Sequence, residues 1–511
     1  MVFLIVITIL LRVPAVNWGI SQGDIFEPDE LQHIEIAREV VHQYDRTLIE
    51  DKTYNDDWNA RAFGVQIAYL FIICNKFGLS PSTTNLILIG RFLSIFYSVI
   101  LVLLIYFYVI VSLKNYRAAF IAALFLSISD LNITYSHYAV PEICHVFYFY
   151  LSILFISNYL KNDRSYLNIL GLGISLGMCL ATKFDPSPII AFGIAWLLYK
   201  KFSDNYRNII LVACIVIFTF AVSWNSIDLM IYYKSFRWVA AVNQNTVLKD
   251  HHYFYNPILY ASAIIAGSSI FIFISGVIGF FKYYINPYAC GIEGKAPLPL
   301  TLTPLILFLI YWTGDATFVR RASAFIPFFC IYSGLYLSTI RNKHLLLLVV
   351  FLIFSYTILL SIISQNAFLE DTRYKARNFI DKKYAKNFVV AYCPYSSAAV
   401  RHFNHRISMY DDRFNDLVQK RTLDFIVLHE TYYGRYGKYF TTPFRIPLNC
   451  DEVYHCRSTL FNTMQSLTQN RSIYKLKYKF SAFNPFPERI LFKMLYGTYE
   501  TFLGDVLIYE H

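Results

Sequence analysis

Long apolar runs recur along the first 364 residues, and they constrain the fold more than any other feature of the chain. Hydrophobic residues make up 56% of the sequence and charged residues 15%, a composition that excludes an ordinary soluble globular protein. A helix needs about 20 apolar residues to cross the hydrocarbon core of a bilayer. We therefore predict a polytopic α-helical membrane protein with about eleven spans, at residues 1–19, 86–112, 118–136, 141–160, 166–182, 187–200, 207–224, 257–281, 298–313, 319–339 and 344–364.

Basic residues in the short loops predict how these helices are oriented, because Lys and Arg accumulate on the cytoplasmic side. Every second connection contains them, whereas the connections at 130–140 and 183–186 contain almost none. This pattern places the N-terminus inside. The first run is too long for a signal peptide and has no small-residue cleavage site, so we expect a retained helix. An odd number of helices then places the tail on the outer side.

The chain divides by composition into a transmembrane module, residues 1–364, and an outer domain, residues 365–511. The module contains two large outer connections: residues 21–83, with interfacial helices, and residues 225–256. The second connection is rich in aromatic and basic side chains. Such residues are ordinary interface anchors, or they could form a lid over a lipid-linked substrate.

The outer domain is predicted to be a small layered α/β domain. It has 21 Lys and Arg against 14 Asp and Glu, a balance that suits phosphate head groups or an acidic polymer. Because the basic residues are dispersed and lie on the far side of the membrane, nucleic acid is not an expected partner. Cys450 and Cys456 could form a disulfide in an oxidising compartment. The predicted elements are a helix over 371–380 and strands at 388–392, 423–428 and 506–509.

A cluster of acidic residues follows the first apolar run. Residues 21–60 contain eleven Asp and Glu but only three basic residues. Pro28 stiffens the chain just before Asp29 and Glu30, and apolar residues at helical spacing follow, so the two carboxylates begin a helix along the membrane surface. Ionisable groups at membrane sites are usually functional, and we predict a catalytic role for Asp29, with Glu30 as the neighbouring candidate. The alternative is a solvated acidic loop.

Several cations are predicted to lie on the same outer side as Asp29. Each alone could extend its side chain to the interface as an anchor. Together they suit a site in which cations hold a phosphate and a carboxylate takes a proton. Adjacent histidines point apart, so no metal site is predicted at residues 251–252. The phosphate-binding candidates are Lys183, Arg320, Arg321 and Arg61, and the further substrate-binding candidates are His33, Arg91, Glu142, His251 and His252.

Five segments are similar, in order and predicted side, to motifs of one enzyme superfamily. They are Arg12 with Pro28-Asp29-Glu30 and Ala37, Gly90 to Ser94, Tyr135 to Glu142, Gly173 to Lys183, and Arg320 to Pro327; the tail segment Asp371 to Ile380 is similar to the start of the same superfamily's outer domain. On these segments the chain resembles the GT-C superfamily of polytopic glycosyltransferases that use polyprenyl-phosphate sugars. The resemblance is strongest to the protein-mannosyltransferase and aminoarabinose-transferase branch and extends over nearly the whole chain.

The resemblance implies a GT-C-like fold, a lipid-linked donor, and Asp29 as the base of an inverting transfer. Two positions depart from the family pattern. Glu142 stands where the family often has Asp, and Arg320-Arg321-Ala322 replaces the usual Arg-Tyr pair. Gln32, Glu35 to Ala37, and Trp58 with Arg61 are similar to a second mannosyltransferase branch, with shorter spacings here. The branch, the sugar and the acceptor therefore stay open.

We expect an integral-membrane glycosyltransferase that moves a monosaccharide from a polyprenyl-phosphate sugar to a hydroxyl of a protein, lipid or glycan. Lys183 with Arg320 or Arg321 would stabilise the departing phosphate. Because the leaving group is a phosphate monoester and residues 21–83 contain no Asp-x-Asp pattern, no metal or other cofactor is expected to be obligatory. A divalent metal is compatible with this chemistry.

Two other functions stay open. A polysaccharide polymerase or ligase acting on lipid-diphosphate glycans would use the same outer-face cations. A lipid or solute transporter usually has internal repeats and broken polar helices at the bilayer midplane, and the sequence shows no repeat. The expected location is the cell membrane of a bacterium or archaeon, or the endoplasmic reticulum membrane of a eukaryote.

Overall fold

The computed structural model describes residues 1–20, 28–45, 61–161, 165–183, 185, 187–199, 206–224, 252–285, 298–313, 319–409, 411, 413–430, 462–463, 466–467, 471–482, 484–496 and 504–511. Contacts divide the chain into two compact units. The first unit comprises Met1–Val242 and Ala263–Ser361, and the second comprises Asn243–Ser262 and Ile362–His511. Each unit is described by itself.

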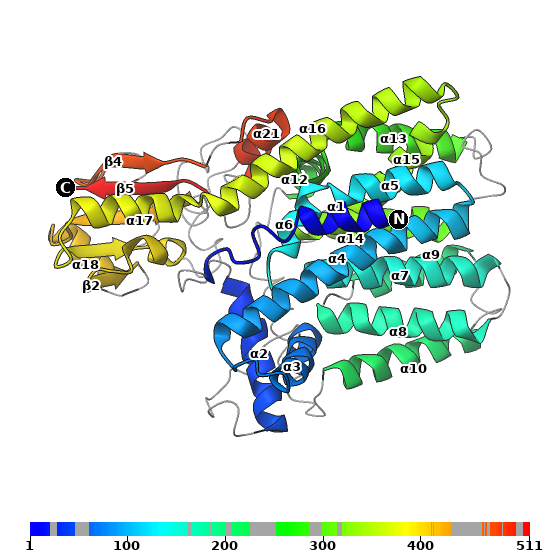
Figure 1. Cartoon of the computed structure of the whole chain (residues 1–511), viewed down its shortest axis with the longest axis horizontal. Coiled ribbons are helices and arrows are strands. Elements are labelled where there is room, and N and C mark those ends of the chain that lie inside the picture. Colours follow the sequence, from blue (N-terminus) through cyan, green and yellow to red (C-terminus); the bar gives the residue numbers. More distant parts are fainter. Residues whose placement is uncertain are drawn as a thin grey trace. The chain divides into compact units, whose positions relative to one another are not determined.

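The first unit is built of helices that coincide with most of the predicted apolar runs (Figure 1). Two of the short predicted runs, 166–182 and 298–313, are helical over the predicted residues. The helices are α1 Val2–Leu10, α2 Pro28–Tyr44, α3 Arg61–Asn75, α4 Thr83–Leu113, α5 Tyr116–Ser127, α6 Asp130–Ser136, α7 Glu142–Lys161, α8 Tyr166–Thr182, α9 Ser187–Tyr199, α10 Tyr206–Ser223, α12 His252–Ser268, α13 Ile270–Ile285, α14 Leu298–Thr313, η4 Val319–Phe325, α15 Ile326–Ser338 and α16 Lys343–Leu369, of which α12 and α16 continue into the second unit.

Three predicted spans differ from the structure: 1–19, 257–281, and 118–136, which is the pair α5 and α6 bent by 54°. The first, 1–19, is helical only to Leu10, because Pro14 has no amide hydrogen and Gly19 adopts a positive φ of 81°. The span 257–281 is two helices, α12 and α13, bent by 114°. Ser269 forms the corner with φ 91°, and its hydroxyl bonds to Thr357 Oγ1 at 2.8 Å. The predicted single straight helix is therefore wrong at 257–281.

Three helical stretches in the described part of the chain are long and apolar enough to cross a membrane: Thr83–Leu113, Tyr206–Ser223 and Lys343–Lys383. The bent pairs α5–α6 and α12–α13 raise this number to five if each pair is one span. Shorter apolar helices accompany them. The protein is thus a polytopic membrane protein, and its total number of spans stays a prediction.

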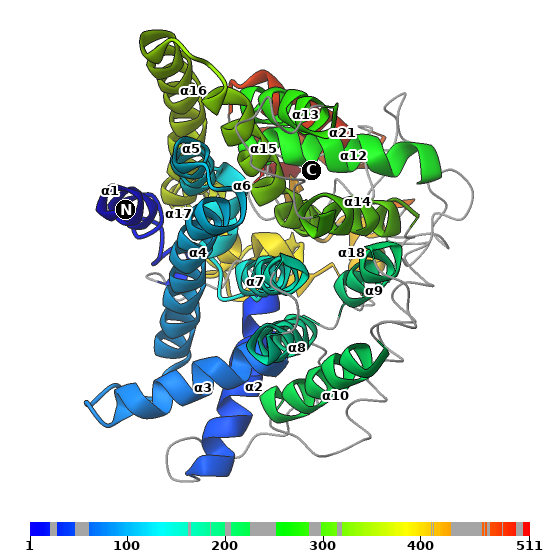
Figure 2. The ribbon, with the colours of Figure 1, turned by 90° about the vertical axis from the view of Figure 1, so that its right-hand side faces the viewer.

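Small residues let neighbouring helices approach closely. Helix α8 packs between α7 and α10 (Figure 2). At Gly177 an added Cβ would lie 2.7 Å from Thr219 Cβ and 2.9 Å from the carbonyl oxygen of Val216. Glycine at this position therefore sets the distance between α8 and α10.

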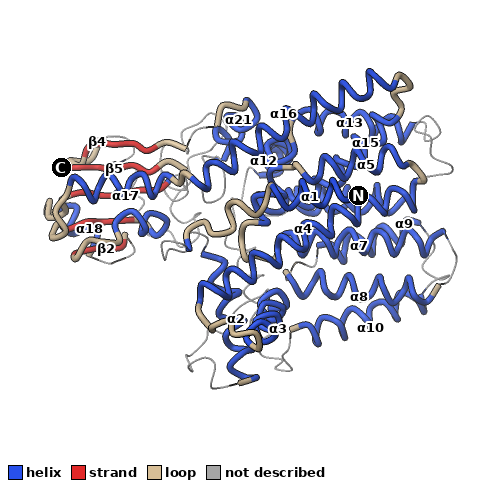
Figure 3. Tube along the Cα trace, viewed as in Figure 1, coloured by secondary structure: helices blue, strands red, loops and turns tan. Residues whose placement is uncertain are grey.

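The second unit contains a five-stranded mixed sheet with strand order β2-β1-β3-β5-β4 (Figure 3). Strand β1 is parallel to β2 and β3, whereas β5 is antiparallel to β3 and β4. One apolar cluster includes residues of α17 and η5, and the other includes residues of α18, so both faces of the central strands are buried. The elements are α17 Thr372–Lys383, β1 Val389–Tyr392, η5 Pro394–Val400, β2 His405–Ser408, α18 Phe414–Gln419, β3 Phe425–His429, β4 Lys475–Phe480, α21 Pro487–Tyr496 and β5 Val506–Glu510.

The sequence predicted three of these strands, β1, β3 and β5, which lie in the middle of the sheet. It missed β2 and β4, the two edge strands. Strand β4 reads Lys-Leu-Lys-Tyr-Lys-Phe, and most of its side chains are exposed. Lysine-rich edges are common in sheets because they prevent pairing with other chains, but they hide the apolar pattern of a strand.

Candidate functional site

Glu30 and Arg91 form a buried ion pair beside the predicted catalytic aspartate. Arg91, in the first half of α4, donates from Nε and Nη2 to the two carboxylate oxygens of Glu30, each at 2.8 Å. Both side chains have no exposed surface. Arg91 Nη1 also donates to the carbonyl oxygens of Val16 and Trp18, each at 2.7 Å. The backbone N–H of Ala139 donates to Glu30 Oε1 at 2.7 Å.

This network joins four segments of the first unit: the chain after α1, the first turn of α2, the first half of α4, and the turn before α7. A bidentate Arg–carboxylate pair fixes the relative orientation of its two elements as well as their distance. Glu30 and Arg91 therefore hold the start of α2, the helix that begins with Pro28 and Asp29, against the bundle.

Glu142, Lys183 and Arg320, three of the candidates chosen from the sequence, lie together in a second cluster. Lys183 Nζ lies 3.4 Å and Arg320 Nη1 lies 3.6 Å from Glu142 Oε1. The Glu142 side chain is 3% exposed, Lys183 21% and Arg320 34%. Glu142 begins α7 after Pro141, Lys183 directly follows α8, and Arg320 lies in η4, so the cluster forms where three helical segments begin or end.

The second oxygen of Glu142, Oε2, is buried and accepts no hydrogen bond from the residues that the structure describes. His33, a buried residue of α2, is close enough to Glu142 to interact with it electrostatically. The His33 ring also packs edge-on against Phe63, with centroids 5.6 Å apart. Glu30 and His33 are three positions apart on α2, so one face of this helix bears a member of the first cluster and a residue that acts electrostatically on the second.

Arg321 belongs to a third group that sequence reasoning did not identify. Its guanidinium lies over the ring of Tyr311 in α14, 4.9 Å from the centroid. The Tyr311 hydroxyl donates to Asp185 Oδ2 at 2.8 Å, and the N–H of Ser187 donates to Asp185 Oδ1 at 2.9 Å. Asp185 stands two residues after Lys183 in a short connection between apolar runs, and this position was a signal that sequence reasoning could have used. Tyr311 lies in an apolar run, and nothing in the sequence distinguished it.

The other predicted residues lie elsewhere or outside the description. Arg61, 1% exposed, pairs with Glu39 at 2.7 Å rather than with the Lys183 cluster. Asp29 is described only as a backbone position in the first turn of α2, and His252 only as the first residue of α12. His251, Cys450 and Cys456 lie outside the described residues. Of the described residues, no three His, Cys, Asp or Glu are grouped to hold a metal ion.

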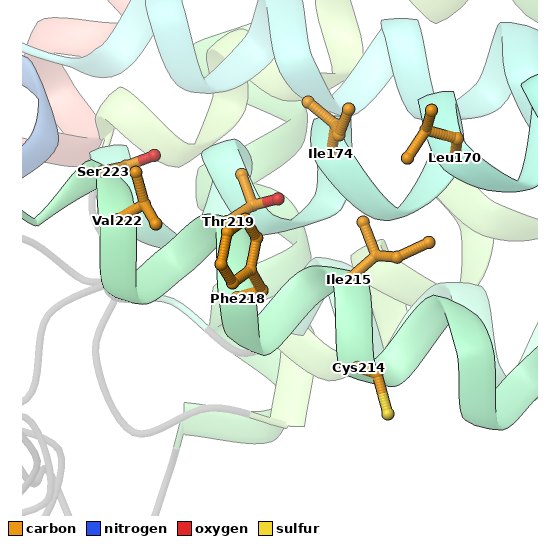
Figure 4. A pocket seen from close by; sticks show the side chains of 8 residues that line it. All are labelled: Leu170, Ile174, Cys214, Ile215, Phe218, Thr219, Val222 and Ser223. Carbon is orange, nitrogen blue, oxygen red and sulfur yellow. The ribbon is translucent and has the colours of Figure 1, made fainter.

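A separate apolar groove of about 490 Å³ lies along the seam of α8 and α10 (Figure 4). None of the predicted site residues lines it. Its lining is aliphatic and aromatic apart from one thiol and two hydroxyl groups, and consists of Leu170, Ile174, Cys214, Ile215, Phe218, Thr219, Val222 and Ser223.

Comparisons with known proteins give one family match over part of the chain and several structures of similar fold. The family model for dolichyl-phosphate-mannose-protein mannosyltransferase matches residues 59–242. No curated protein sequence matches the chain. Several solved structures share its fold at low sequence identity.

Two of these relatives are bacterial and archaeal transferases. ArnT from Cupriavidus metallidurans, bound to undecaprenyl phosphate, has 11% identity and a TM-score of 0.52, covering 84% of this chain and 93% of that one. The Archaeoglobus fulgidus oligosaccharyltransferase, in complex with zinc and sulfate, has 12% identity and a TM-score of 0.53, covering 88% and 70%. The same archaeal enzyme, AglB, in complex with an inhibitory peptide and a dolichol-phosphate, has 12% identity and a TM-score of 0.53. The match covers 84% of this chain and 70% of that one. Residues 59–242 are thus similar to the protein mannosyltransferase family, and the chain shares the fold of ArnT and of the archaeal oligosaccharyltransferase.

Proposed function

We propose that the protein transfers a monosaccharide from a polyprenyl-phosphate sugar to an acceptor hydroxyl at the outer membrane face, with inversion at the anomeric carbon. The observation that supports this most is the meeting of Lys183 and Arg320, 137 residues apart in the sequence, at the buried Glu142. Two cations at one point suit a phosphate group. The relatives solved with undecaprenyl phosphate and with dolichol-phosphate contain such a group.

Lys183 has donors left for a ligand, and Arg320 holds a second positive charge near it. Their distances to Glu142, 3.4 and 3.6 Å, exceed the 2.7–2.9 Å of a strong charge-assisted bond. An ammonium group has three donors, so the one oxygen of Glu142 does not satisfy all donors of Lys183. In our proposal Glu142 keeps the two cations close together, and the phosphate of the donor binds to Lys183 in the positive field of both.

The reaction we propose has two coupled parts. The acceptor oxygen forms a bond to the anomeric carbon, while its proton passes to the carboxylate of Asp29. The bond between the anomeric carbon and the phosphate oxygen breaks, and its electron pair stays on the lipid phosphate. That phosphate gains negative charge as it leaves, so cations already in place at Lys183 and Arg320 stabilise the transition state more than the ground state.

Asp29 and Glu30 take different roles in this proposal. Glu30 accepts three hydrogen bonds while fully buried, so its oxygens are occupied by Arg91 and Ala139. We assign it to positioning the first turn of α2. Asp29 is the adjacent residue and stands one helical turn before His33, which interacts with Glu142. The base role therefore goes to Asp29.

Asp29→Asn tests the assignment, because the amide keeps the shape and removes the base. Transfer from a polyprenyl-phosphate mannose in proteoliposomes should fall by about 10²–10⁴-fold. Binding of undecaprenyl phosphate should persist, since the substitution removes a charge that repels phosphate. Glu370→Gln is the matched control, because Glu370 is 58% exposed at the surface of the second unit. Equal transfer rates for Asp29→Asn and this control would contradict the proposal.

The runner-up function is a polymerase or ligase that uses lipid-diphosphate glycans. The likeness to the archaeal oligosaccharyltransferase, over 88% of this chain, favours it. Competition distinguishes the two. If the donor is a monophosphate, undecaprenyl phosphate should displace the substrate better than undecaprenyl diphosphate does. The opposite order of affinity would favour the runner-up. The comparisons give a transporter no support.

The proposed chemistry uses no obligatory metal, since a phosphate monoester leaves and two side-chain cations take its charge. Transfer should therefore persist in EDTA. Rescue of EDTA-treated protein by Mn²⁺ or Mg²⁺ would contradict this part of the proposal. The membrane we propose is the cell membrane of a bacterium or archaeon, or the endoplasmic reticulum membrane of a eukaryote.

A further inference from the structure

Helix α21, Pro487–Tyr496, in the second unit has apolar side chains on its buried face and also on its exposed face. Arg489, Phe492 and Leu495 are at most 4% exposed and face the interior. Ile490, Leu491 and Met494 are 44%, 46% and 54% exposed. A soluble domain exposes single apolar residues routinely, but three on one short helix require a partner or a cost in solubility.

The three exposed residues form one continuous stripe. Residues at positions i, i+1 and i+4 of a helix fall within an arc of about 100°. The buried residues at 489, 492 and 495 occupy the opposite side of the helix. No charged residue lies among the exposed three, and the Lys493 ammonium group is engaged by Glu430 and Asp505 at 3.1 and 3.4 Å.

A hydrogen bond joins the segment before α21 to helix α16. Asn484 Nδ2 donates to Ser364 Oγ at 3.2 Å, and both residues belong to the second unit. Ser364 lies on α16, 21 residues after its first residue, Lys343. At 1.5 Å per residue this is about 31 Å, the thickness of the hydrocarbon core. Pro487, three residues after Asn484, can lie at most about 10 Å farther away.

The lipid-facing surface of α16 also extends to this level. Ile362 is 49% exposed and Leu369 58% exposed, so exposed apolar side chains recur to the end of α16, with the exposed Asn366 between them. The exposed stripe of α21 thus begins near the level at which an established apolar surface leaves the bilayer.

We propose that α21 is an in-plane membrane anchor: Ile490, Leu491 and Met494 insert into the boundary between head groups and acyl chains of the bilayer that α16 crosses. Its partner is the lipid surface itself. A helix with an apolar face and its axis in the interface binds in this way, and the anchor restrains the second unit at the membrane surface. This inference does not depend on the proposed function.

Fluorescence quenching in nanodiscs tests the proposal on the full chain. Met494→Cys is labelled with the environment-sensitive dye NBD, and Arg413→Cys, at a residue 75% exposed in the same unit, is the matched control. The labelled unsubstituted chain gives the background from native cysteines. NBD at 494 should emit at shorter wavelength and be quenched several-fold more strongly than NBD at 413 by lipids with a spin label near the head group.

Iodide in the aqueous phase should give the opposite order, with residue 413 quenched more strongly. Equal quenching of both sites by iodide, with no quenching by the labelled lipid, would overturn the proposal. Blue-shifted emission at 494 that the labelled lipid does not quench, and that disappears at one chain per nanodisc, would also overturn it, because a second copy of the chain would then cover the stripe.

Discussion

Arg91 binds both carboxylate oxygens of Glu30 at 2.8 Å, and neither side chain reaches solvent. If one of the two charged groups is removed, water cannot reach the other to solvate its charge. Removing one member of a buried pair typically costs about 3–5 kcal/mol, because the other charge stays buried and unpaired. We therefore expect the pair to stabilise the fold, and to affect the candidate site only by holding α2 in position.

Glu30→Gln should lower the free energy of unfolding by about 3–5 kcal/mol, since it leaves the Arg91 charge uncompensated. The measurement is thermal unfolding in detergent, with Glu370→Gln as the exposed control. Loss of transfer with an unchanged unfolding temperature would instead show that Glu30 acts in the chemistry.

Lys183→Ala should weaken the binding of undecaprenyl phosphate by about 10- to 100-fold, the range for one charge-assisted hydrogen bond. It should lower kcat as well, because the cation stabilises the transition state, in which the phosphate gains charge, more than the ground state. Isothermal titration and initial rates measure the two effects. Lys420→Ala, at a residue 65% exposed in the second unit, should change neither. Unaltered phosphate binding in Lys183→Ala would contradict the phosphate role.

Tyr311→Phe tests the hydrogen bond between Tyr311 and Asp185 without removing the ring beneath Arg321. The ring that lies under the guanidinium is kept, whereas the hydrogen bond to Asp185 is lost and a buried acceptor loses its partner. The expected loss in the free energy of unfolding is about 1–3 kcal/mol. Donor affinity should fall less than in Lys183→Ala. Tyr166→Phe, at a residue 76% exposed, is the control, and an effect of the same size there would contradict the role of the bond.

Gly177→Ala should destabilise the bundle by about 1–3 kcal/mol, because its new methyl group lies within 3 Å of Thr219 Cβ and the Val216 carbonyl oxygen. Gly193→Ala in α9 is the matched control, since an added Cβ there meets no atom within 4 Å. That substitution should leave the protein as stable or slightly more stable. Equal unfolding temperatures for both variants would show that α8 and α10 are not packed as closely as described.

The sidedness of the chain can be tested by cysteine labelling from one side of the membrane. Ser481→Cys, exposed in the second unit, should react with an impermeant reagent added outside. Asn342→Cys, exposed just before α16, should react only after the membrane is permeabilised. The reverse pattern would overturn the topology and the outer-face site together.

Sequence alone determined most of the helix positions and the order of the motifs, because hydropathy and basic loop residues are local properties. It found Lys183, Arg320 and Glu142 as a group because each lies at the end of an apolar run on one predicted side. It did not find the corner at Ser269, since a single residue with positive φ leaves the hydropathy of 257–281 unchanged.

Tertiary structure decided which charges meet. Arg91 and Glu30 are 61 residues apart and Tyr311 and Asp185 are 126 apart, so their pairing depends on how helices pack and not on any local pattern. Packing also separated Arg61, bound to Glu39, from the Lys183 cluster, although both are cations on the predicted outer side. A sequence shows which side chains can reach the interface, but a buried ion forms its pairs only where the folded chain removes it from water.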